Sequence, residues 1–381
     1  MRRMMNRRTL LTASLAALPL PALAQSGDTV RSDRAAFRLT TLATGLDRPW
    51  GAALLPDGSL LVTERPGGLR RVTPSGEVSA PLAGVPEVEA RGQGGMLDIA
   101  IAPDFARTRE VYLSHAMLVQ GGALTRLTRA RLSADATALE GVTPILDATP
   151  AQPSGRNHYG SRIAFGPDGR LYLSTGDRMN DKMRSQRLDD LAGKILRLER
   201  DGSAAAGNPF LGRGDARAEI FSYGHRNPQG LAFNPWTGGL WQAEFGARGG
   251  DEINLVRPGL NYGWPVVSHG VDYNGSPIGT GQKEAPGIEA PLHFWTPSVS
   301  PSGINFYTGN AFPGWSRSLF VAALNPPGLV RLETEGERVV AEERLLFDRR
   351  IRMRQVVVAA DGALLVLTDE GRGRILRLIP A

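Results

Sequence analysis

Six segments of the chain repeat one pattern of apolar and polar residues. In each segment a short apolar run is followed by a tight polar turn and then by a second apolar run. The turns lie at residues 56–58, 103–104, 167–169, 235–238, about 310–314 and 360–362. Pro-Asp-Gly at the first and third turns favours a tight reversal, because Pro fixes φ and Gly accepts a positive φ. Each segment therefore predicts a β-hairpin whose strands are buried on both faces.

A third short apolar run follows each hairpin, and we expect it to form a further strand of the same sheet. These runs cover residues 69–72, 127–132, 195–198, 253–256, 329–332 and 375–378. One small sheet repeated along the chain is typical of a β-propeller, in which blades surround a channel. The sequence predicts an all-β fold, a six-bladed β-propeller with four-stranded antiparallel blades. The alternative is a two-layer sandwich in which the turns coincide by chance.

The first 24 residues have the composition of an export signal. Arg7 and Arg8 precede an apolar stretch that ends near Leu20, and 22–24 reads Ala-Leu-Ala, a typical cleavage site. The paired arginines indicate a twin-arginine signal, which exports folded proteins. We expect residues 1–24 to be removed and residues 25–381 to form a single catalytic propeller in the periplasm. No other stretch contains eighteen apolar residues, so no membrane span is expected.

Composition excludes several kinds of function. The chain contains no cysteine, which excludes disulfides, thiolate nucleophiles and Cys-ligated zinc. The net charge is +6, but four of these charges are arginines of the first 24 residues. The rest of the chain is close to neutral, and we therefore expect no nucleic-acid partner.

Candidate chemistry lies in the loops between repeats, because the loops of a propeller converge at one end of its channel. His158 precedes the third hairpin and Asp177 ends it, so folding of the hairpin brings the two side chains together. A carboxylate beside an imidazole fixes its tautomer and raises its basicity, which suits a general base. The alternative is a histidine that only bonds to a loop backbone.

Two loops around the fourth hairpin carry further polar residues. Arg226, Asn227 and Gln229 lie before it and offer donors to an anionic or polyoxygenated ligand, although a solvated loop has the same residues. Asp251 and Glu252 follow a glycine-rich loop after it. Their oxygens are of the kind that Ca²⁺ binds, but an exposed acidic turn explains them equally well.

A basic run precedes the sixth hairpin. Arg350, Arg352 and Arg354 alternate there, so in an extended segment all three share one face. That face would clamp carboxylates bidentately, or else protect an edge strand from pairing.

Together these motifs resemble the soluble PQQ-dependent sugar dehydrogenases, the family of aldose sugar dehydrogenase and soluble glucose dehydrogenase. The similarity runs from about Leu46 to Leu378. The segments that carry it are residues 92–97, 158–177, 224–230, 250–254 and 261–265. The resemblance implies a six-bladed propeller that uses PQQ and Ca²⁺ to oxidise the anomeric hydroxyl of an aldose to a lactone.

The resemblance also implies roles for individual residues. His158 matches the general base, Asp177 the carboxylate that orients it, and Arg226 the residue beside the quinone oxygen as hydride moves to the cofactor. The implied cofactor contacts are Arg226, Asn227, Thr296, Asn325, Arg352 and Arg354. The implied sugar contacts are Gln93 and Asn157. The implied calcium ligands are the carbonyls of Gly246 and Ala247, with Asp251, Glu252 and Tyr262 at a structural ion.

Two positions depart from the family pattern. Asn325 stands where relatives often have a lysine, and Thr296 occupies the place of a stacking aromatic, with Trp295 one residue out of step. Both changes predict weaker PQQ binding. The expected partners are an aldose and an electron acceptor, and the protein is expected to be a monomer or homodimer. Two other functions remain open, a calcium-dependent lactonase or esterase and a non-catalytic carbohydrate-binding propeller.

Overall fold

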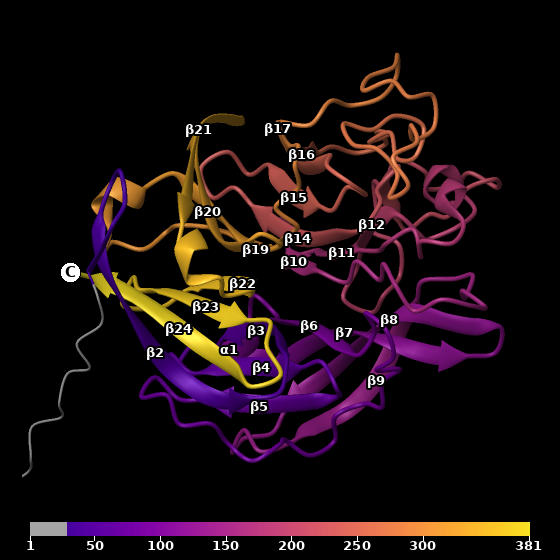
Figure 1. The fold of residues 1–381 in the computed structure, drawn as a ribbon. Helices are drawn as coiled ribbons and strands as arrows, with labels where there is room; N and C mark the ends of the chain where they lie inside the picture. The colour runs from indigo at the N-terminus through magenta and orange to yellow at the C-terminus, as the bar shows by residue number, and fades with distance from the viewer. Residues whose placement is uncertain (1–28) are drawn as a thin grey trace, which may run out of the picture.

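The chain forms a ring of antiparallel sheets (Figure 1). A computed structural model describes residues 29–381, so the predicted export signal of residues 1–24 lies outside the described part of the chain. Within that part the only α-helix is α1 (Phe105–Thr108), accompanied by three short 3₁₀ turns. The prediction of an all-β fold is confirmed.

Six sheets of consecutive strands make the blades. The first blade contains β3 (Pro49–Leu54), β4 (Leu60–Glu64) and β5 (Gly68–Val72). The second contains β6 (Met96–Ile101), β7 (Glu110–Val119), β8 (Gly122–Leu132) and β9 (Leu139–Asp147). The third contains β10 (Ile163–Phe165), β11 (Leu171–Ser174), β12 (Lys194–Leu198) and β13 (Ile220–Tyr223).

The remaining three blades follow the same order. The fourth contains β14 (Pro228–Phe233), β15 (Leu240–Glu244), β16 (Asp251–Val256) and β17 (His293–Trp295). The fifth contains β18 (Pro301–Phe306), β19 (Ser318–Leu324), β20 (Pro327–Glu335) and β21 (Arg338–Leu345). The sixth contains β22 (Met353–Val358), β23 (Leu364–Thr368) and β24 (Gly373–Pro380), joined by β2 (Ala36–Leu46) and β1 (Thr29–Arg31).

The innermost strands form a closed circle. Each first strand contacts the first strand of the next blade, in the order β3, β6, β10, β14, β18, β22 and back to β3. The ring is closed by β2, which pairs antiparallel with β24 from the other end of the chain. The prediction of six blades is confirmed. Strand number differs in two of them: this closure gives the sixth blade five strands, and the first blade has three because the chain beyond β5 is mostly irregular.

The hairpins fold as their apolar pattern predicts. Every residue of β4 and of β23 is buried, as expected for strands covered on both faces. Gly58 and Gly169 have φ of 80° and 75° at the Pro-Asp-Gly turns, a conformation that costs glycine little. Hydrophobic clusters lie between neighbouring blades; one of them joins Trp241 of β15 to Phe306 of β18. The core is therefore a set of layers around the ring.

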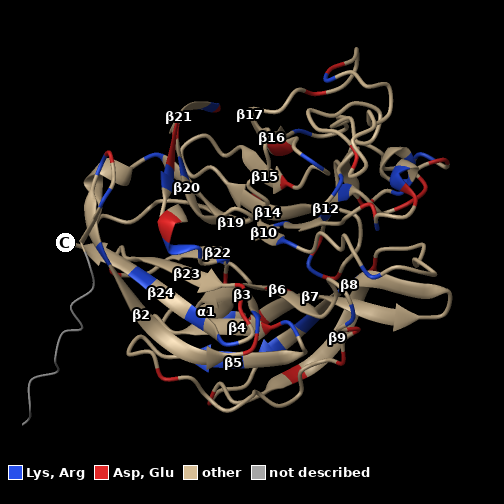
Figure 2. Cartoon of the chain, viewed as in Figure 1, with Lys and Arg blue, Asp and Glu red and all other residues tan. Residues whose placement is uncertain are grey.

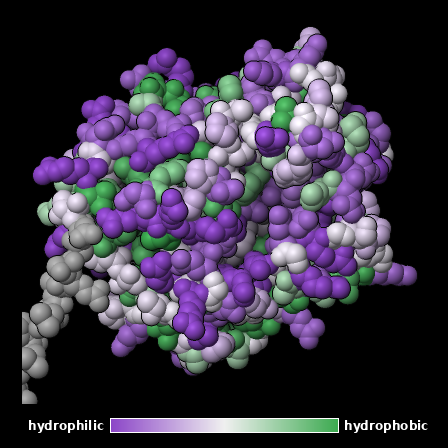
Figure 3. Space-filling model, in the orientation of Figure 1, coloured by the Kyte–Doolittle hydropathy of each residue, from purple (hydrophilic) through white to green (hydrophobic). Residues whose placement is uncertain are grey.

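The surface has mixed character. Acidic and basic residues are interspersed along the chain (Figure 2), and the face in Figure 3 shows hydrophilic residues broken by scattered apolar ones. In residues 29–381 no helix has the length and apolar character needed to cross a bilayer.

Candidate active site

One cavity of about 1190 Å³ is lined by loops and strand ends of the ring. Most of the residues singled out in the sequence lie in its wall. These are Gln93, His158, Arg226, Asn227, Gln229, Gly246, Ala247, Asp251, Thr296, Asn325, Arg352 and Arg354. The fold thus brings together residues separated by more than two hundred positions along the chain.

His158 and Asp177 form the predicted pair. His158 precedes β10 and Asp177 follows β11, and the His158 Nδ1 and Asp177 Oδ1 atoms lie 2.7 Å apart. The two residues are only 4% and 0% exposed. Because Nδ1 is engaged by the carboxylate, Nε2 is the ring nitrogen left to accept a proton.

The backbone around this pair is unusual. His158, Ser161, Arg178 and Met179 all have positive φ although none is glycine, with His158 at 50°. Such conformations cost free energy and are maintained only where the surrounding structure imposes them, often at functional sites. The Asp177 N–H donates to the Arg226 carbonyl, at 2.8 Å, and so ties this loop to the next one.

Burial sets the protonation of the pair. Removal from water lowers the pKa of His158, Arg226 and Arg178 lower it further, and the Asp177 carboxylate opposes the change. Burial alone would raise the pKa of Asp177, but the hydrogen bond from His158 and the nearby positive charges hold it below its ordinary value. The resting pair is therefore a neutral imidazole beside a carboxylate, as a general base requires.

Arg226 lies between β13 and β14 and points along the cavity wall. Its Nη1 donates to the carbonyls of Phe245 and Gly246, at 3.2 and 2.5 Å, and its Nη2 lies 2.9 Å from the Tyr273 hydroxyl. Its backbone N–H donates to the Glu244 carboxylate, at 2.6 Å. Arg226 Nε is buried and has no partner within residues 29–381. One guanidinium donor thus remains for a ligand.

Arg352 and Arg354 lie together, as predicted, and share one carboxylate. Arg352 Nη2 and Arg354 Nη2 lie 2.7 and 3.1 Å from the oxygens of Asp369, which follows β23. Arg354 also donates to the Gln229 side chain, at 2.7 Å. Burial alone would raise the pKa of Asp369, but the charges of Arg354 and Arg352 lower it to about 2. Asp369 is therefore ionised and holds both guanidinium groups in place.

The prediction that Arg350 shares this face is wrong. Arg350 follows a 3₁₀ turn and has φ of 52°, so the segment is not extended there and the alternation of side chains begins only after it. Arg350 is exposed and does not line the cavity, whereas Arg352 and Arg354 do.

Three further predicted cofactor contacts border the cavity. Asn227 Oδ1 accepts from the Gly160 N–H at 3.1 Å, and Thr296 Oγ1 accepts from the Gly250 N–H at 3.1 Å. Asn325 lies exposed between β19 and β20. Trp295, the displaced aromatic, is buried and its Nε1 donates to Glu342, at 2.9 Å, away from the cavity. Of Thr296 and Trp295, only Thr296 therefore lines the cavity.

The two predicted sugar contacts differ in position. Gln93 lines the cavity and its Oε1 accepts from the His158 N–H at 2.9 Å, so it supports the base directly. Asn157 instead directs its Nδ2 to the sulfur of Met179, at 3.3 Å, and does not line the cavity. The geometry favours Gln93 over Asn157 as a contact for substrate.

Three predicted calcium ligands line the cavity, Gly246 and Ala247 for an ion at the cofactor and Asp251 for a structural ion, and they are only partly available. The carbonyl of Gly246 accepts from Arg226 Nη1, which leaves one of its lone pairs, and Ala247 lies beside it in the wall. The Asp251 carboxylate accepts four hydrogen bonds, from the N–H groups of Gly246, Val299 and Ser300 and the hydroxyl of Ser298. Asp251 therefore organises the surrounding loops and has little capacity for an ion.

Glu252 and Tyr262 have a different environment. Burial and the charge of Glu244 raise the pKa of Glu252. Asn254 donates to both carboxylates, at 3.1 and 3.3 Å, while its buried Oδ1 has no partner in the described residues. Two close carboxylates and an unpartnered oxygen suit a cation. The Tyr262 hydroxyl donates to the Leu255 carbonyl at 2.6 Å and accepts from the Arg257 N–H at 2.9 Å. Only the backbone carbonyl of Tyr262 is therefore available to a metal.

Sequence reasoning missed several residues of the site. Trp264 donates its indole N–H to Asp177 Oδ2 at 2.7 Å, and Tyr273 meets Arg226 as described above. Asp369 holds the arginine pair, and Trp50 lies near Arg354, with 5.7 Å from the guanidinium carbon to the ring centre. Trp264 lies in a segment that carries the family resemblance, which was the one available signal for its importance.

Comparison with known proteins identifies relatives of the whole chain. The Glucose / Sorbosone dehydrogenase family matches residues 46–377. The chain belongs to this family. Within it, the aldose sugar dehydrogenase YliI of Escherichia coli (strain K12) is 41% identical over 349 residues, which are 91% of this chain and 94% of that protein.

Solved structures of the family have the same architecture. A crystal structure of a glucose dehydrogenase is 46% identical and superimposes with a TM-score of 0.86, covering 90% of this chain and 99% of its own. The PQQ-bound aldose sugar dehydrogenase of Streptomyces coelicolor is 32% identical with a TM-score of 0.75, covering 90% and 98% of the two chains. The resemblance inferred from the sequence motifs is confirmed, and the chain is by descent a member of a sugar dehydrogenase family.

Proposed function

We propose that the protein oxidises the anomeric hydroxyl of aldoses to lactones with PQQ as its cofactor. The observation that carries this proposal is the meeting of a buried base, His158 with Asp177, and three arginines, Arg226, Arg352 and Arg354, in one cavity. A propeller that only bound carbohydrate would have no need of the buried base. The PQQ-bound relative from Streptomyces coelicolor supports the choice of cofactor.

The cavity fits an anionic planar ligand. Its charged lining comprises six arginines and two aspartates: Arg48, Arg65, Arg226, Arg248, Arg352, Arg354, Asp251 and Asp369. Buried Nε atoms of Arg226 and Arg354 have no partners within the described residues, and so have donors to spare. Guanidinium groups bind carboxylates bidentately, and PQQ carries three carboxylates. Arg226, Arg352, Arg354, Asn227, Thr296 and Asn325 are the proposed cofactor contacts.

The protein's own part in the reaction is proton removal. When bound, PQQ supplies the acceptor for the hydride of the sugar. His158 Nε2 takes the proton of the anomeric hydroxyl, and the Asp177 carboxylate stabilises the imidazolium that forms. Arg226 holds a positive charge where the acceptor becomes negative. Gln93 fixes the His158 backbone and contacts the sugar. Asn157 is the second proposed substrate contact, although it lies behind the cavity lining against Met179.

Calcium is proposed at two places. At the cavity the carbonyls of Gly246 and Ala247 would hold an ion beside the cofactor, where it would polarise the quinone. Away from it, Glu252 and the Tyr262 carbonyl would hold a structural ion, with Asp251 supporting the adjoining loop through its hydrogen bonds. The remaining proposals are an aldose substrate, a separate electron acceptor, a periplasmic location reached by the twin-arginine route, and a monomeric or homodimeric state.

The proposal is tested by reconstitution. The purified chain is incubated with PQQ and Ca²⁺, an aldose is added, and reduction of an artificial electron acceptor is followed. Dye reduction that requires both PQQ and aldose supports the proposal. Hydrolysis of a lactone without PQQ would indicate a lactonase, and glycan binding without turnover would indicate a non-catalytic propeller; either outcome overturns it.

A further inference from the structure

Trp264 makes a direct contact with the carboxylate of the proposed catalytic pair. It lies in the segment between β16 and β17, is 6% exposed, and donates its indole N–H to Asp177 Oδ2 at 2.7 Å. The other oxygen, Oδ1, accepts from His158 Nδ1 and from the Met179 N–H, each at 2.7 Å. Within residues 29–381, Trp264 is the one donor that reaches Oδ2. The plane of the carboxylate, and with it the direction of the imidazole, therefore depends on the indole.

The same indole also lies against the guanidinium of Arg226, a residue of the cavity wall. The Arg226 guanidinium carbon lies 5.1 Å from the Trp264 ring centre, within the range of a cation–π contact. The edge of the ring thus holds the carboxylate that orients the base, while its face lies against the proposed electrostatic group. A single rigid side chain therefore contacts both the carboxylate of Asp177 and the guanidinium of Arg226.

Trp264 is itself fixed by polar contacts to its backbone. Its carbonyl accepts from Ser185 Oγ at 2.7 Å and from Gln186 Nε2 at 2.6 Å, and its N–H donates to the Gly224 carbonyl at 2.9 Å. Ser185 and Gln186 belong to the 3₁₀ turn η1 (Lys182–Gln186). The position of the indole is thus determined before any ligand binds.

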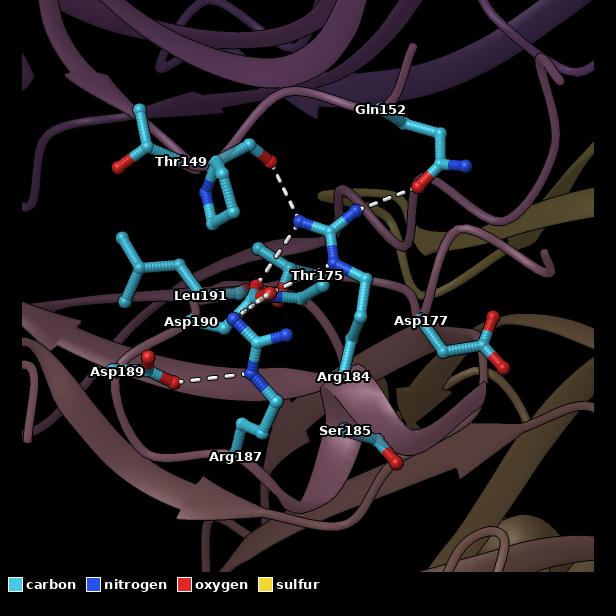
Figure 4. Close-up of polar contacts among 12 residues, drawn as sticks. Thr149, Gln152, Thr175, Asp177, Arg184, Ser185, Arg187, Asp189, Asp190 and Leu191 are labelled. Carbon is cyan, nitrogen blue, oxygen red and sulfur yellow. Dashed lines mark hydrogen bonds and ion pairs between the residues drawn. The ribbon is translucent and has the colours of Figure 1, made fainter. Parts of the chain in front are cut away.

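The turn η1 is anchored in turn by buried charges. Figure 4 shows Arg184 between Gln152 and Asp190, with Arg184 Nε 2.8 Å from Asp190 Oδ2. The buried Lys194 ammonium donates to the carbonyls of Arg184 and Ser185, each at 3.0 Å. These contacts hold the turn without using any residue of the cavity.

From this geometry we propose that Trp264 is a positioning residue for proton removal by His158, acting through Asp177 Oδ2. The inference rests on the proposed function for its catalytic consequence. Its structural part concerns the His158–Asp177 pair alone, and is measurable in the cofactor-free protein.

The test is Trp264→Phe, which keeps a ring against Arg226 and removes the N–H. Without that donor the Asp177 charge acts more fully on His158, so the His158 titration and the acidic limb of kcat/KM move to higher pH. Arg226 and Arg178, the other charges that face His158, are unchanged. We expect kcat to fall about tenfold while KM for the aldose changes less than about twofold, since the substrate contacts remain.

Trp315→Phe is the matched control. Trp315 is a fully buried tryptophan whose Nε1 lies 3.3 Å from Ser32 Oγ, in a hydrophobic cluster shared by β19 and β22 and remote from the cavity lining. Its replacement lowers thermal stability without moving the His158 titration. Trp264→Phe with a wild-type titration and wild-type kcat overturns the proposal, as does a fall in kcat that leaves the acidic limb in place.

Two measurements keep the outcome clear. Titration of His158 by NMR in the cofactor-free protein tests the role of Trp264 even where dye reduction fails and the proposed function falls. If Trp264→Phe does not fold, the indole N–H resonances of the wild type are compared with those of Asp177→Ala. We expect one downfield, slowly exchanging indole resonance that moves upfield in Asp177→Ala; no such change overturns the proposal.

Discussion

Asp177→Asn is the substitution that tests the proposed base most sharply. The carboxylate accepts three hydrogen bonds, two at Oδ1 from His158 and Met179 and one at Oδ2 from Trp264. An asparagine has one acceptor oxygen, so its amide group must face at least one of these donors. The change removes the negative charge behind the imidazole and also leaves a buried N–H group unpaired.

The size of the effect follows from these contacts. A hydrogen bond to a charged group contributes about 1.5–3 kcal/mol and a neutral one about 0.5–1.5, so neutralising Asp177 weakens its bond to the imidazolium by about 1–2 kcal/mol. The unpaired donor disturbs the orientation of the pair at a cost of about 1–3 kcal/mol. Taken together, a loss of about 2–5 kcal/mol in the transition state predicts a fall in kcat of about 30-fold to about 5,000-fold.

The assay is steady-state dye reduction across pH with PQQ in excess. The Asp177 carboxylate opposes the lowering of the His158 pKa, so its removal moves that pKa, and the acidic limb of kcat/KM, to lower pH while the plateau falls. This shift of the acidic limb is opposite in direction to the one expected for Trp264→Phe. Glu343→Gln is the control, because Glu343 pairs with the buried Arg331 on the fifth blade, at 2.8 Å and outside the cavity lining, and its replacement should lower stability without moving the limb. A plateau reduced less than about threefold, or a limb moved to higher pH, would refute the reasoning.

Four further predictions use other parts of the site. His158→Ala abolishes dye reduction but leaves PQQ bound, since the base contacts substrate; loss of PQQ absorbance from the washed variant would contradict this. Asn325→Lys restores a cation at the cavity and tightens PQQ binding by about tenfold, or about 1.4 kcal/mol, in a fluorescence titration, where unchanged affinity counts against the site. Chelation with EDTA lowers Tm, because an ion bound only by the native state stabilises it by about 2.7 kcal/mol at a hundred times its Kd; an unchanged Tm argues against structural calcium. For Asp369, whose pKa of about 2 lies below its ordinary 3.8, the added stability is present above about pH 4 and is lost as pH falls through about 2. The difference in unfolding free energy between wild type and Asp369→Asn should thus shrink by about 2 kcal/mol over that range, and a constant difference would be contrary.

The blades were predictable because their signal is local. Each hairpin is a few apolar residues on either side of a turn, as in β3 and β4, and the regular spacing of these units leaves few folds to consider. The pairing of β2 with β24 was not predictable in this way. It joins the two ends of the chain, and neither strand alone carries a signal for the other.

The same distinction applies to the site. His158 and Asp177 were predictable as neighbours because one hairpin separates them, and Arg352 and Arg354 because two positions do. Trp264 lies 87 residues from Asp177, and no local pattern joins them. The error at Arg350 has a local cause, since this left-handed residue lies before the extended segment, where the alternation of side chains does not yet hold.

The central claim is that this cavity binds a quinone beside His158 and Arg226. It is tested most directly by titrating the cofactor-free protein with PQQ in the presence of Ca²⁺, following the quinone absorption band, and then adding an aldose without any other acceptor. We predict saturable binding of one PQQ per chain and loss of the oxidised band on addition of sugar, with the loss abolished in His158→Ala. Failure to bind PQQ, or a band that sugar leaves unchanged in the wild type, would contradict the account.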